Sequence, residues 1–99
     1  MQIIDRKRLS VVTGGASGIG LAITEKFITQ GISTVVIGRD LKKLKDVESR
    51  FGSLCKTIAF DLNDLACIPA LVEKIISKFG DIDILINNAG INQKKEFTE

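Results

Sequence analysis

Short runs of apolar residues without polar interruptions most constrain the fold of this 99-residue chain. Residues 11–12, 35–37 and 84–86 form such runs within β-rich segments. A strand covered on one face alternates apolar and polar residues, whereas a strand covered on both faces is continuously apolar. The runs therefore predict a parallel sheet with helices on either side.

Predicted strands alternate with predicted helices along the chain. The strands are expected at residues 9–13, 33–38, 57–60 and 82–87. Helical periodicity predicts a first helix from residue 18 or 19 to 30 and a second helix that ends at residue 51, with Asp40 as its N-cap. A third helix is expected from Pro69 to residue 79, after a separate turn capped by Asn63 or Asp64. This βαβαβαβ order predicts an α/β fold with right-handed crossovers, in one small domain.

Each predicted helix carries an apolar stripe and is followed by a glycine. Gly31, Gly52 and Gly80 stand just past the helix ends, where a glycine adopts the left-handed conformation without strain. The stripes expected to face the sheet are Ile19, Ala22, Ile23 and Phe27 in the first helix, Leu41, Leu44, Val47 and Phe51 in the second, and Ile68, Leu71, Val72, Ile75, Ile76 and Phe79 in the third.

The composition excludes several function classes. The chain has no His, Trp or Tyr, so these 99 residues hold no His base, no His-containing metal site and no Tyr acid. Its 14 basic and 12 acidic residues give a net charge of +2, and the basic clusters are not interleaved with aromatics, which favours a solvated surface over a nucleic-acid patch. No apolar run exceeds four residues, so we expect no membrane span and no secretory signal.

Cys55 and Cys67 are surrounded by apolar neighbours in the sequence and form no Cys-x-x-Cys pair. We expect both to be buried, reduced thiols in a cytoplasmic protein, in preference to a disulfide or redox role.

A glycine-rich turn follows the first predicted strand, with the sequence Thr-Gly-Gly-Ala-Ser-Gly-Ile-Gly at residues 13–20. We expect Gly14 to allow the tight turn, Gly18 to let the backbone approach a diphosphate, and Gly20 to let the helix pack closely on the sheet. The helix N–H groups would then face the phosphates, which makes Gly14, Ser17, Gly18, Ile19 and Gly20 candidate cofactor residues. Tight crossovers that bind nothing also use glycines. The turn lacks a Gly-Lys-Ser/Thr ending, which disfavours a P-loop hydrolase.

The spacing Thr-Gly-x-x-x-Gly-x-Gly, together with Asn-Asn-Ala-Gly at residues 87–90, closely resembles the short-chain dehydrogenase/reductase family. The resemblance implies a Rossmann-type, doubly wound sheet of order 3-2-1-4 that stops after the fourth strand, so that residues 1–99 form one partial NAD(P)-binding domain. It also implies that Asn87, Ala89 and Gly90 border the cofactor ribose. Taken alone, the same four residues could simply turn the chain.

The end of the second predicted strand bears on the choice of cofactor. NAD enzymes usually carry an acidic residue there, whereas this chain has Arg39, which would pair with a 2′-phosphate. Asp40 is expected to cap a helix instead. NADP is therefore favoured over NAD, although Ser17, another position where relatives carry a basic residue, is not basic. By resemblance, Asp61 accepts from the adenine amino group and Leu62 contributes backbone; Asp61 could equally be a turn residue.

The resemblance implies an NAD(P)-dependent oxidoreductase that acts on a carbonyl/alcohol pair and forms a homo-oligomer. The family's catalytic Ser and Tyr-x-x-x-Lys are absent from the 99 residues, so we assign no catalytic residue and expect no turnover by this chain alone. An apolar edge at Ile82, Ile84 and Ile86 predicts self-association or a piece of a longer protein. The alternative is a non-catalytic dinucleotide-binding or interaction module.

Overall fold

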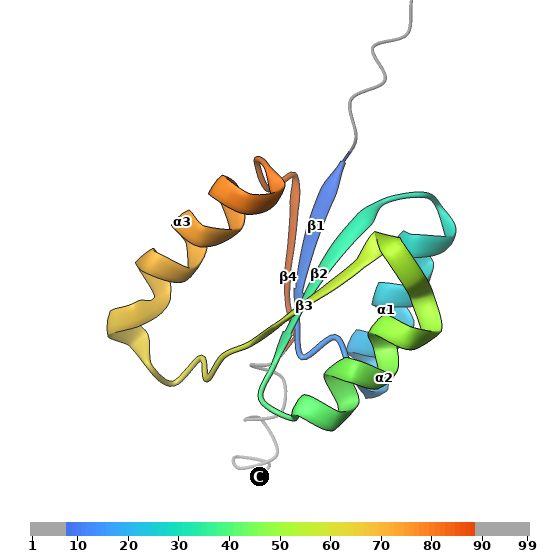
Figure 1. The fold of residues 1–99 in the computed structure, drawn as a ribbon, viewed down its shortest axis with the longest axis horizontal. Helices are drawn as coiled ribbons and strands as arrows, with labels where there is room; N and C mark the ends of the chain where they lie inside the picture. The colour runs from blue at the N-terminus through green and yellow to red at the C-terminus, as the bar shows by residue number, and fades with distance from the viewer. Residues whose placement is uncertain (1–7, 89–99) are drawn as a thin grey trace, which may run out of the picture.

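A computed structural model describes residues 8–88 of the chain. Strands and helices alternate, as the sequence predicts (Figure 1). The order is β1 (Leu9–Thr13), α1 (Gly18–Thr29), β2 (Ser33–Gly38), α2 (Leu41–Phe51), β3 (Cys55–Ala59), α3 (Ile68–Phe79) and β4 (Ile84–Asn87), with 3₁₀ turns at Gly52–Leu54 and Leu65–Cys67.

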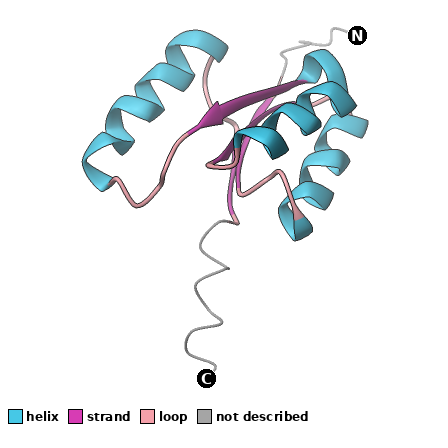
Figure 2. Cartoon of the chain, turned by 60° about the horizontal axis from the view of Figure 1, so that its bottom comes forward, coloured by secondary structure: helices cyan, strands magenta, loops and turns pink. Residues whose placement is uncertain are grey.

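The four strands form one parallel sheet in the order β3-β2-β1-β4, which confirms the predicted Rossmann-type topology. Helices α1 and α2 cover one face of the sheet and α3 covers the other (Figure 2). A clamp joins β4 to β1 at the start of the strands. The Leu9 N–H donates to Asp83 Oδ2 at 2.8 Å, and the Asp83 N–H donates to the Leu9 carbonyl oxygen at 2.9 Å.

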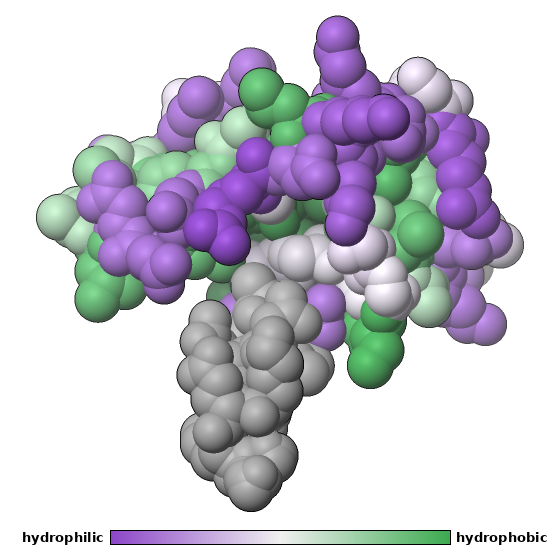
Figure 3. Space-filling view, turned by 90° about the horizontal axis from the view of Figure 1, so that it is seen from below, coloured by the Kyte–Doolittle hydropathy of each residue, from purple (hydrophilic) through white to green (hydrophobic). Residues whose placement is uncertain are grey.

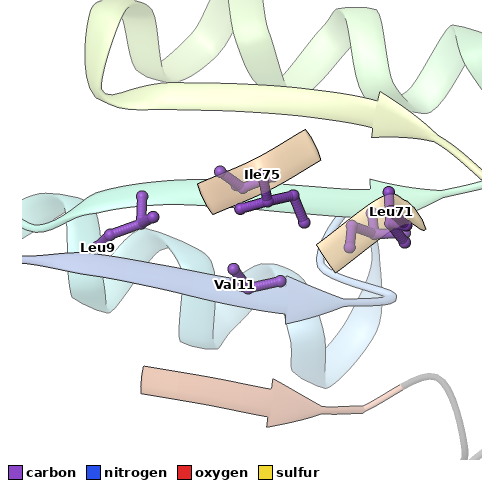
Figure 4. Packing of buried hydrophobic residues seen from close by; sticks show 6 residues of the cluster. Leu9, Val11, Leu71 and Ile75 are labelled. Carbon is purple, nitrogen blue, oxygen red and sulfur yellow. The ribbon is translucent and has the colours of Figure 1, made fainter. Parts of the chain in front are cut away.

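The core between the sheet and α3 contains alternate residues of the two central strands (Figure 4). Leu9 and Val11 of β1 point toward Leu71 and Ile75 of α3, and all four side chains are buried. Complete burial of a side chain such as Ile75 stabilises the fold by about 2–3 kcal/mol. Leu71 and Ile75, one helical turn apart, thus anchor α3 to the sheet, and Phe79 packs beside them.

The core on the opposite face is built differently from the prediction for the first helix. Ile19, predicted to face the sheet, is 62% exposed, and Ala22 is also exposed. The buried residues of α1 are Gly20 and Thr24. Gly20 and Thr24 face inward because the first turns of the helix approach the β1–α1 connection more closely than an isoleucine would allow, while Leu21 and Ile28 pack against the core.

The helix ends follow the predicted signals. The Asp40 carboxylate accepts from the N–H groups of Lys42 and Lys43 at 3.0 and 3.2 Å, which confirms it as the N-cap of α2. Gly31, Gly52 and Gly80 have φ values of 81°, 77° and 108°. Because side chains are strained in this region, the three glycines fix where each helix ends.

Several predicted boundaries and faces need correction. Strand β3 occupies Cys55–Ala59 instead of residues 57–60, because its pairing with β2 begins at Thr34 and Cys55. Strand β4 begins at Ile84, two residues later than predicted. Helix α3 begins at Ile68, and the preceding 3₁₀ turn has Asp64 at its N-cap, but the Asp64 side chain makes no capping hydrogen bond to the backbone. Besides Ile19 and Ala22, three further residues of the predicted stripes are exposed: Leu41, Val72 and Ile76.

The two cysteines differ in burial. Cys55 is buried, as predicted, but Cys67 is exposed because it ends the 3₁₀ turn before α3; both thiols are free. Burial, reinforced by the nearby Glu48 carboxylate, raises the pKa of Cys55 to about 11. A hydrogen bond to Asp64 raises the pKa of Cys67. Within residues 8–88, every helix is too short or too polar to cross a membrane.

Candidate dinucleotide-binding site

The glycine-rich turn leaves β1 and enters α1 at the edge where the parallel strands end (Figure 1). Gly14 has a φ of 67°, and its N–H donates to the Ile37 carbonyl oxygen at 2.8 Å. This bond ties the turn to the end of β2. Gly14 therefore permits the tight turn, as the sequence predicts.

Gly20 is required by the closest approach in the turn. A Cβ atom at this position would overlap the carbonyl oxygen of Gly14 and lie 2.6 Å from Asn88 Nδ2. Neither neighbour has room to move, because one is backbone and the other is a buried side chain. The predicted role of Gly20 in close packing is thus confirmed by the geometry.

Thr24 and Gly15 form a second contact, which sequence reasoning missed. The fully buried Thr24 hydroxyl donates to the Gly15 carbonyl oxygen at 3.1 Å. A Cβ atom on Gly15 would lie only 2.7 Å from that hydroxyl oxygen. The only sequence signal was a polar residue four positions after Gly20, on the helix face that carries the glycine. Together, Gly15, Gly20 and Thr24 hold the start of α1 against the turn.

The N-terminus of α1 faces solvent. Ser17 is the N-cap residue, with extended backbone, and its side chain makes no capping hydrogen bond. Ser17, Gly18 and Ile19 are all exposed. The first N–H groups of a helix have no acceptor within the helix, and they attract anions together with the positive end of the helix dipole. A Cβ atom on Gly18, at φ 58°, would meet no atom within 4 Å, so this surface is open to a ligand.

Two asparagines connect the end of β4 to the turn. The Thr13 hydroxyl donates to Asn87 Oδ1 at 2.9 Å, and the buried Asn88 donates through Nδ2 to the Gly14 carbonyl oxygen at 3.2 Å. These residues therefore brace β1 and its turn in addition to ending the strand. Ala89 and Gly90, the other two residues of the predicted motif, lie outside the described residues.

Arg39, Asp61 and Leu62 follow the ends of β2 and β3. Arg39 Nη1 lies 3.9 Å from Asp61 Oδ2, and both side chains are largely exposed. The other Asp61 oxygen, Oδ1, accepts from the Asn63 N–H at 2.9 Å. Leu62 is half-buried and packs against the core on the α3 side. The predicted cofactor residues of the described chain thus lie along one edge of the sheet.

An apolar pocket of about 510 Å³ lies between α3 and strands β1 and β4. Leu71 and Ile75 form part of its wall, and Thr13 and Asn87 provide polar groups. Figure 3 shows hydrophobic side chains gathered on the α3 side of the molecule. Val72, Ile76 and Leu85 are 38%, 41% and 62% exposed there. Ile84 and Ile86, expected at the exposed edge, are half-buried, as is Ile82, so Leu85 carries most of the exposed apolar surface of β4.

Within residues 8–88, no three His, Cys, Asp or Glu side chains are grouped so that they could hold a metal ion.

The parallel sheet and its glycine-rich turn define the chain as a Rossmann-type α/β protein. The profile of one family, described as short chain dehydrogenase, matches residues 8–99. The chain belongs to this short-chain dehydrogenase family, as its motifs predict.

Similar proteins include an uncharacterized oxidoreductase of Staphylococcus epidermidis, which is 33% identical over 95% of this chain and 41% of its own length. The 3-oxoacyl-[acyl-carrier-protein] reductase of Salmonella typhimurium is 33% identical over 87% of this chain and 35% of its own length. L-sorbose reductase of Gluconobacter frateurii, crystallised with NADPH and L-sorbose, matches with 38% identity and a TM-score of 0.73, over 85% of this chain and 34% of that structure. The chain thus spans well under half the length of these relatives.

Proposed function

We propose that this chain binds NADP(H) and forms the cofactor-binding part of an oxidoreductase that acts on a carbonyl/alcohol pair. The observation that carries the proposal is the turn between β1 and α1. It presents the uncapped N-terminus of α1 beside Gly18, at which a Cβ atom would point into open space. These features fit a diphosphate, because they combine N–H donors, a positive dipole end and room for close approach.

The cofactor residues are assigned from the family motifs that they match and, within residues 8–88, from their place along the strand ends. The backbone of Gly14, Ser17, Gly18, Ile19 and Gly20 surrounds the diphosphate. Asn87, Ala89 and Gly90 border the cofactor ribose, with Asn87 oriented by its hydrogen bond to Thr13. When bound, the dinucleotide would supply hydride to a carbonyl or accept it from an alcohol, and the residues of this chain would hold and orient it.

Arg39 selects NADP over NAD. Its exposed guanidinium stands at the end of β2, where a 2′-phosphate on the adenosine ribose would find a cationic partner. The neighbouring acid, Asp40, caps α2 with its carboxylate, so Arg39 is the residue at this position that contacts the adenosine ribose. Asp61 and Leu62 contact the adenine.

The family's Tyr-x-x-x-Lys pair has no counterpart among these 99 residues. The 99 residues contain no Tyr, so they hold no phenol to serve as the family's acid or base. We therefore propose that the chain alone binds cofactor without turnover. The free thiols of Cys55 and Cys67 agree with a reducing, cytoplasmic location.

Self-association is proposed for the chain on its own. Strand β4 lies at the edge of the sheet, beside the exposed apolar side chains Val72, Ile76 and Leu85. Within residues 8–88 its outer edge has no neighbouring strand, and a free strand edge beside apolar surface favours pairing with a second copy.

Fluorescence titration of NADPH tests the proposal directly, because the chain contains no Trp or Tyr to contribute emission. Gly18→Ala would place a methyl group where the diphosphate approaches, and we expect NADPH binding to weaken at least about tenfold, or about 1.4 kcal/mol. Gly31→Ala is the matched control. It imposes similar strain, since φ is 58° at Gly18 and 81° at Gly31, and its Cβ atom also meets nothing within 4 Å, but it follows the far end of α1. Absence of NADPH binding by the unmodified chain, or equal weakening by the two variants, would contradict the proposal.

A further inference from the structure

The Arg39 and Asp61 side chains are brought together by the pairing of β2 with β3. Gly38, the last residue of β2, pairs in register with Ala59, the last residue of β3. Beyond this pair, the Phe60 N–H donates to the Gly38 carbonyl oxygen at 2.9 Å. The backbone thus fixes the two chain segments from which Arg39 and Asp61 project, and Arg39 Nη1 lies 3.9 Å from Asp61 Oδ2.

The Asp61 carboxylate is held in place by its own turn. Oδ1 accepts from the Asn63 N–H at 2.9 Å, and the Asp61 carbonyl oxygen accepts from the Asp64 N–H, also at 2.9 Å. This leaves Oδ2 directed at the guanidinium. Asp40, adjacent to Arg39 in sequence, instead uses its carboxylate on the backbone of α2. Asp61 is therefore the acid that shares the charge of Arg39.

We propose that Asp61 is a specificity-determining residue that restrains the preference of this chain for NADP over NAD. The inference rests on the proposed function, in which Arg39 binds the 2′-phosphate. A phosphate paired with Arg39 would lie within about one Debye length, roughly 8–10 Å, of the Asp61 carboxylate. Two anions then share one guanidinium, and the repulsion between them weakens the binding of NADP. NAD carries a hydroxyl at this position and avoids the repulsion.

The adenine contact assigned to Asp61 has a different signature. The adenine amino group is common to NAD and NADP, so loss of a hydrogen bond to it weakens both cofactors by the same factor. The ratio of the two affinities therefore isolates the effect of Asp61 on the 2′-phosphate.

The test compares NADPH and NADH binding to the chain and to Asp61→Asn, by fluorescence titration at low salt. Asparagine keeps the side-chain oxygen that accepts from the Asn63 N–H and removes only the charge. We expect the ratio of NADPH affinity to NADH affinity to rise about three- to fivefold, the scale of an exposed ion pair. The rise should shrink in 0.5 M salt, where screening removes a charge effect but preserves a structural one.

Asp81→Asn is the control for net charge. Asp81 is an exposed acid that follows α3 and precedes β4, at the opposite edge of the sheet, and its removal should leave the ratio unchanged. Asp61→Ser, whose hydroxyl also accepts from backbone, should reproduce the rise if asparagine disturbs the fold, as circular dichroism would reveal.

An unchanged or lower ratio in Asp61→Asn, with both cofactors still bound, overturns the inference and leaves dinucleotide binding intact. The same is true of a rise that persists in high salt or appears equally in Asp81→Asn. Failure of the unmodified chain to bind either cofactor overturns the proposed function and this inference with it.

Discussion

The two faces of the sheet are covered in contrasting ways. On the α1 side, Gly20 and Thr24 bring a helix close to the backbone of the glycine-rich turn, and little space is left. On the α3 side, one helix leaves a pocket of about 510 Å³ and exposes Val72, Ile76 and Leu85. Both faces have a buried apolar core, but only on the α1 side do a glycine and a buried hydroxyl fix how closely a helix approaches the sheet. The turn that starts α1 at the edge with the candidate cofactor site is therefore closely packed, whereas the α3 side leaves a pocket and exposed apolar side chains.

The largest expected effect concerns α3. Ile75 is 1% exposed, and Ile75→Ala would leave a cavity between the sheet and α3. Within residues 8–88, α3 is the only helix that covers this face. We expect the free energy of unfolding to fall by about 3–4 kcal/mol, measured by urea denaturation. Ile76→Ala, at the adjacent and 41% exposed position, should lower it by less than about 1 kcal/mol. Equal losses at the two positions would contradict the placement of α3.

The tight face is tested by Gly20→Ala. Alanine normally favours a helix by about 1 kcal/mol over glycine, but here the methyl group would overlap the Gly14 carbonyl oxygen. We expect a net loss of about 2 kcal/mol in unfolding free energy, because backbone must move to relieve the overlap. The exposed Ala22→Gly in the same helix should lose about 1 kcal/mol from propensity alone. Stabilisation by Gly20→Ala would show that α1 does not approach the turn this closely.

Thr24→Val removes the hydroxyl that donates to Gly15 and keeps the shape of the side chain. We expect a loss of about 1.5 kcal/mol in urea denaturation, since a buried carbonyl oxygen loses its donor. Thr29→Val is a suitable control, because the Thr29 hydroxyl also donates to a backbone carbonyl oxygen. Its acceptor is Glu25, four residues back, on the exposed side of α1. A smaller loss for Thr24→Val than for Thr29→Val would refute the role of the Thr24–Gly15 contact.

Burial of Cys55 in the core on the α2 side makes the free energy of unfolding depend on pH. The pKa of Cys55 is raised to about 11 in the folded chain, against an ordinary value of 9.0, so the folded chain retains the thiol proton at pH values where the unfolded chain has lost it. Stability from this group is therefore complete below pH 9 and is lost as the pH rises toward 11. At pH 10 we expect the loss to be about 1 kcal/mol. Cys55→Ala should lack this component, and identical pH profiles for the two proteins would exclude it.

The sequence predicted the four strands, the three helices and their glycine stops, because each depends on local periodicity or on a single backbone conformation. The strand order was implied instead by the resemblance of the glycine-rich turn and the Asn-Asn-Ala-Gly motif to the short-chain dehydrogenase/reductase family. It misassigned the inner face of α1, since hydrophobicity selected Ile19 while close packing selected Gly20 and Thr24. It located Arg39 and Asp61 at neighbouring strand ends but gave no sign that their side chains pair. Such a contact depends on strand register and on turn geometry, which no short sequence pattern specifies.

The smallest effect on stability, and the sharpest test of the open face, is expected from Leu85→Lys. Leu85 is 62% exposed on the edge strand, so a lysine there should change the unfolding free energy by no more than about 0.5 kcal/mol. Charged residues on an edge strand oppose pairing with another chain. We therefore expect sedimentation of the unmodified chain to show self-association and that of Leu85→Lys to show a monomer. Leu41→Lys provides the control, because Leu41 is 65% exposed at the start of α2, on the other side of the sheet. If both variants dissociate equally, self-association reflects general apolar exposure; if only Leu85→Lys does, the uncovered face beside β4 is where the chains meet.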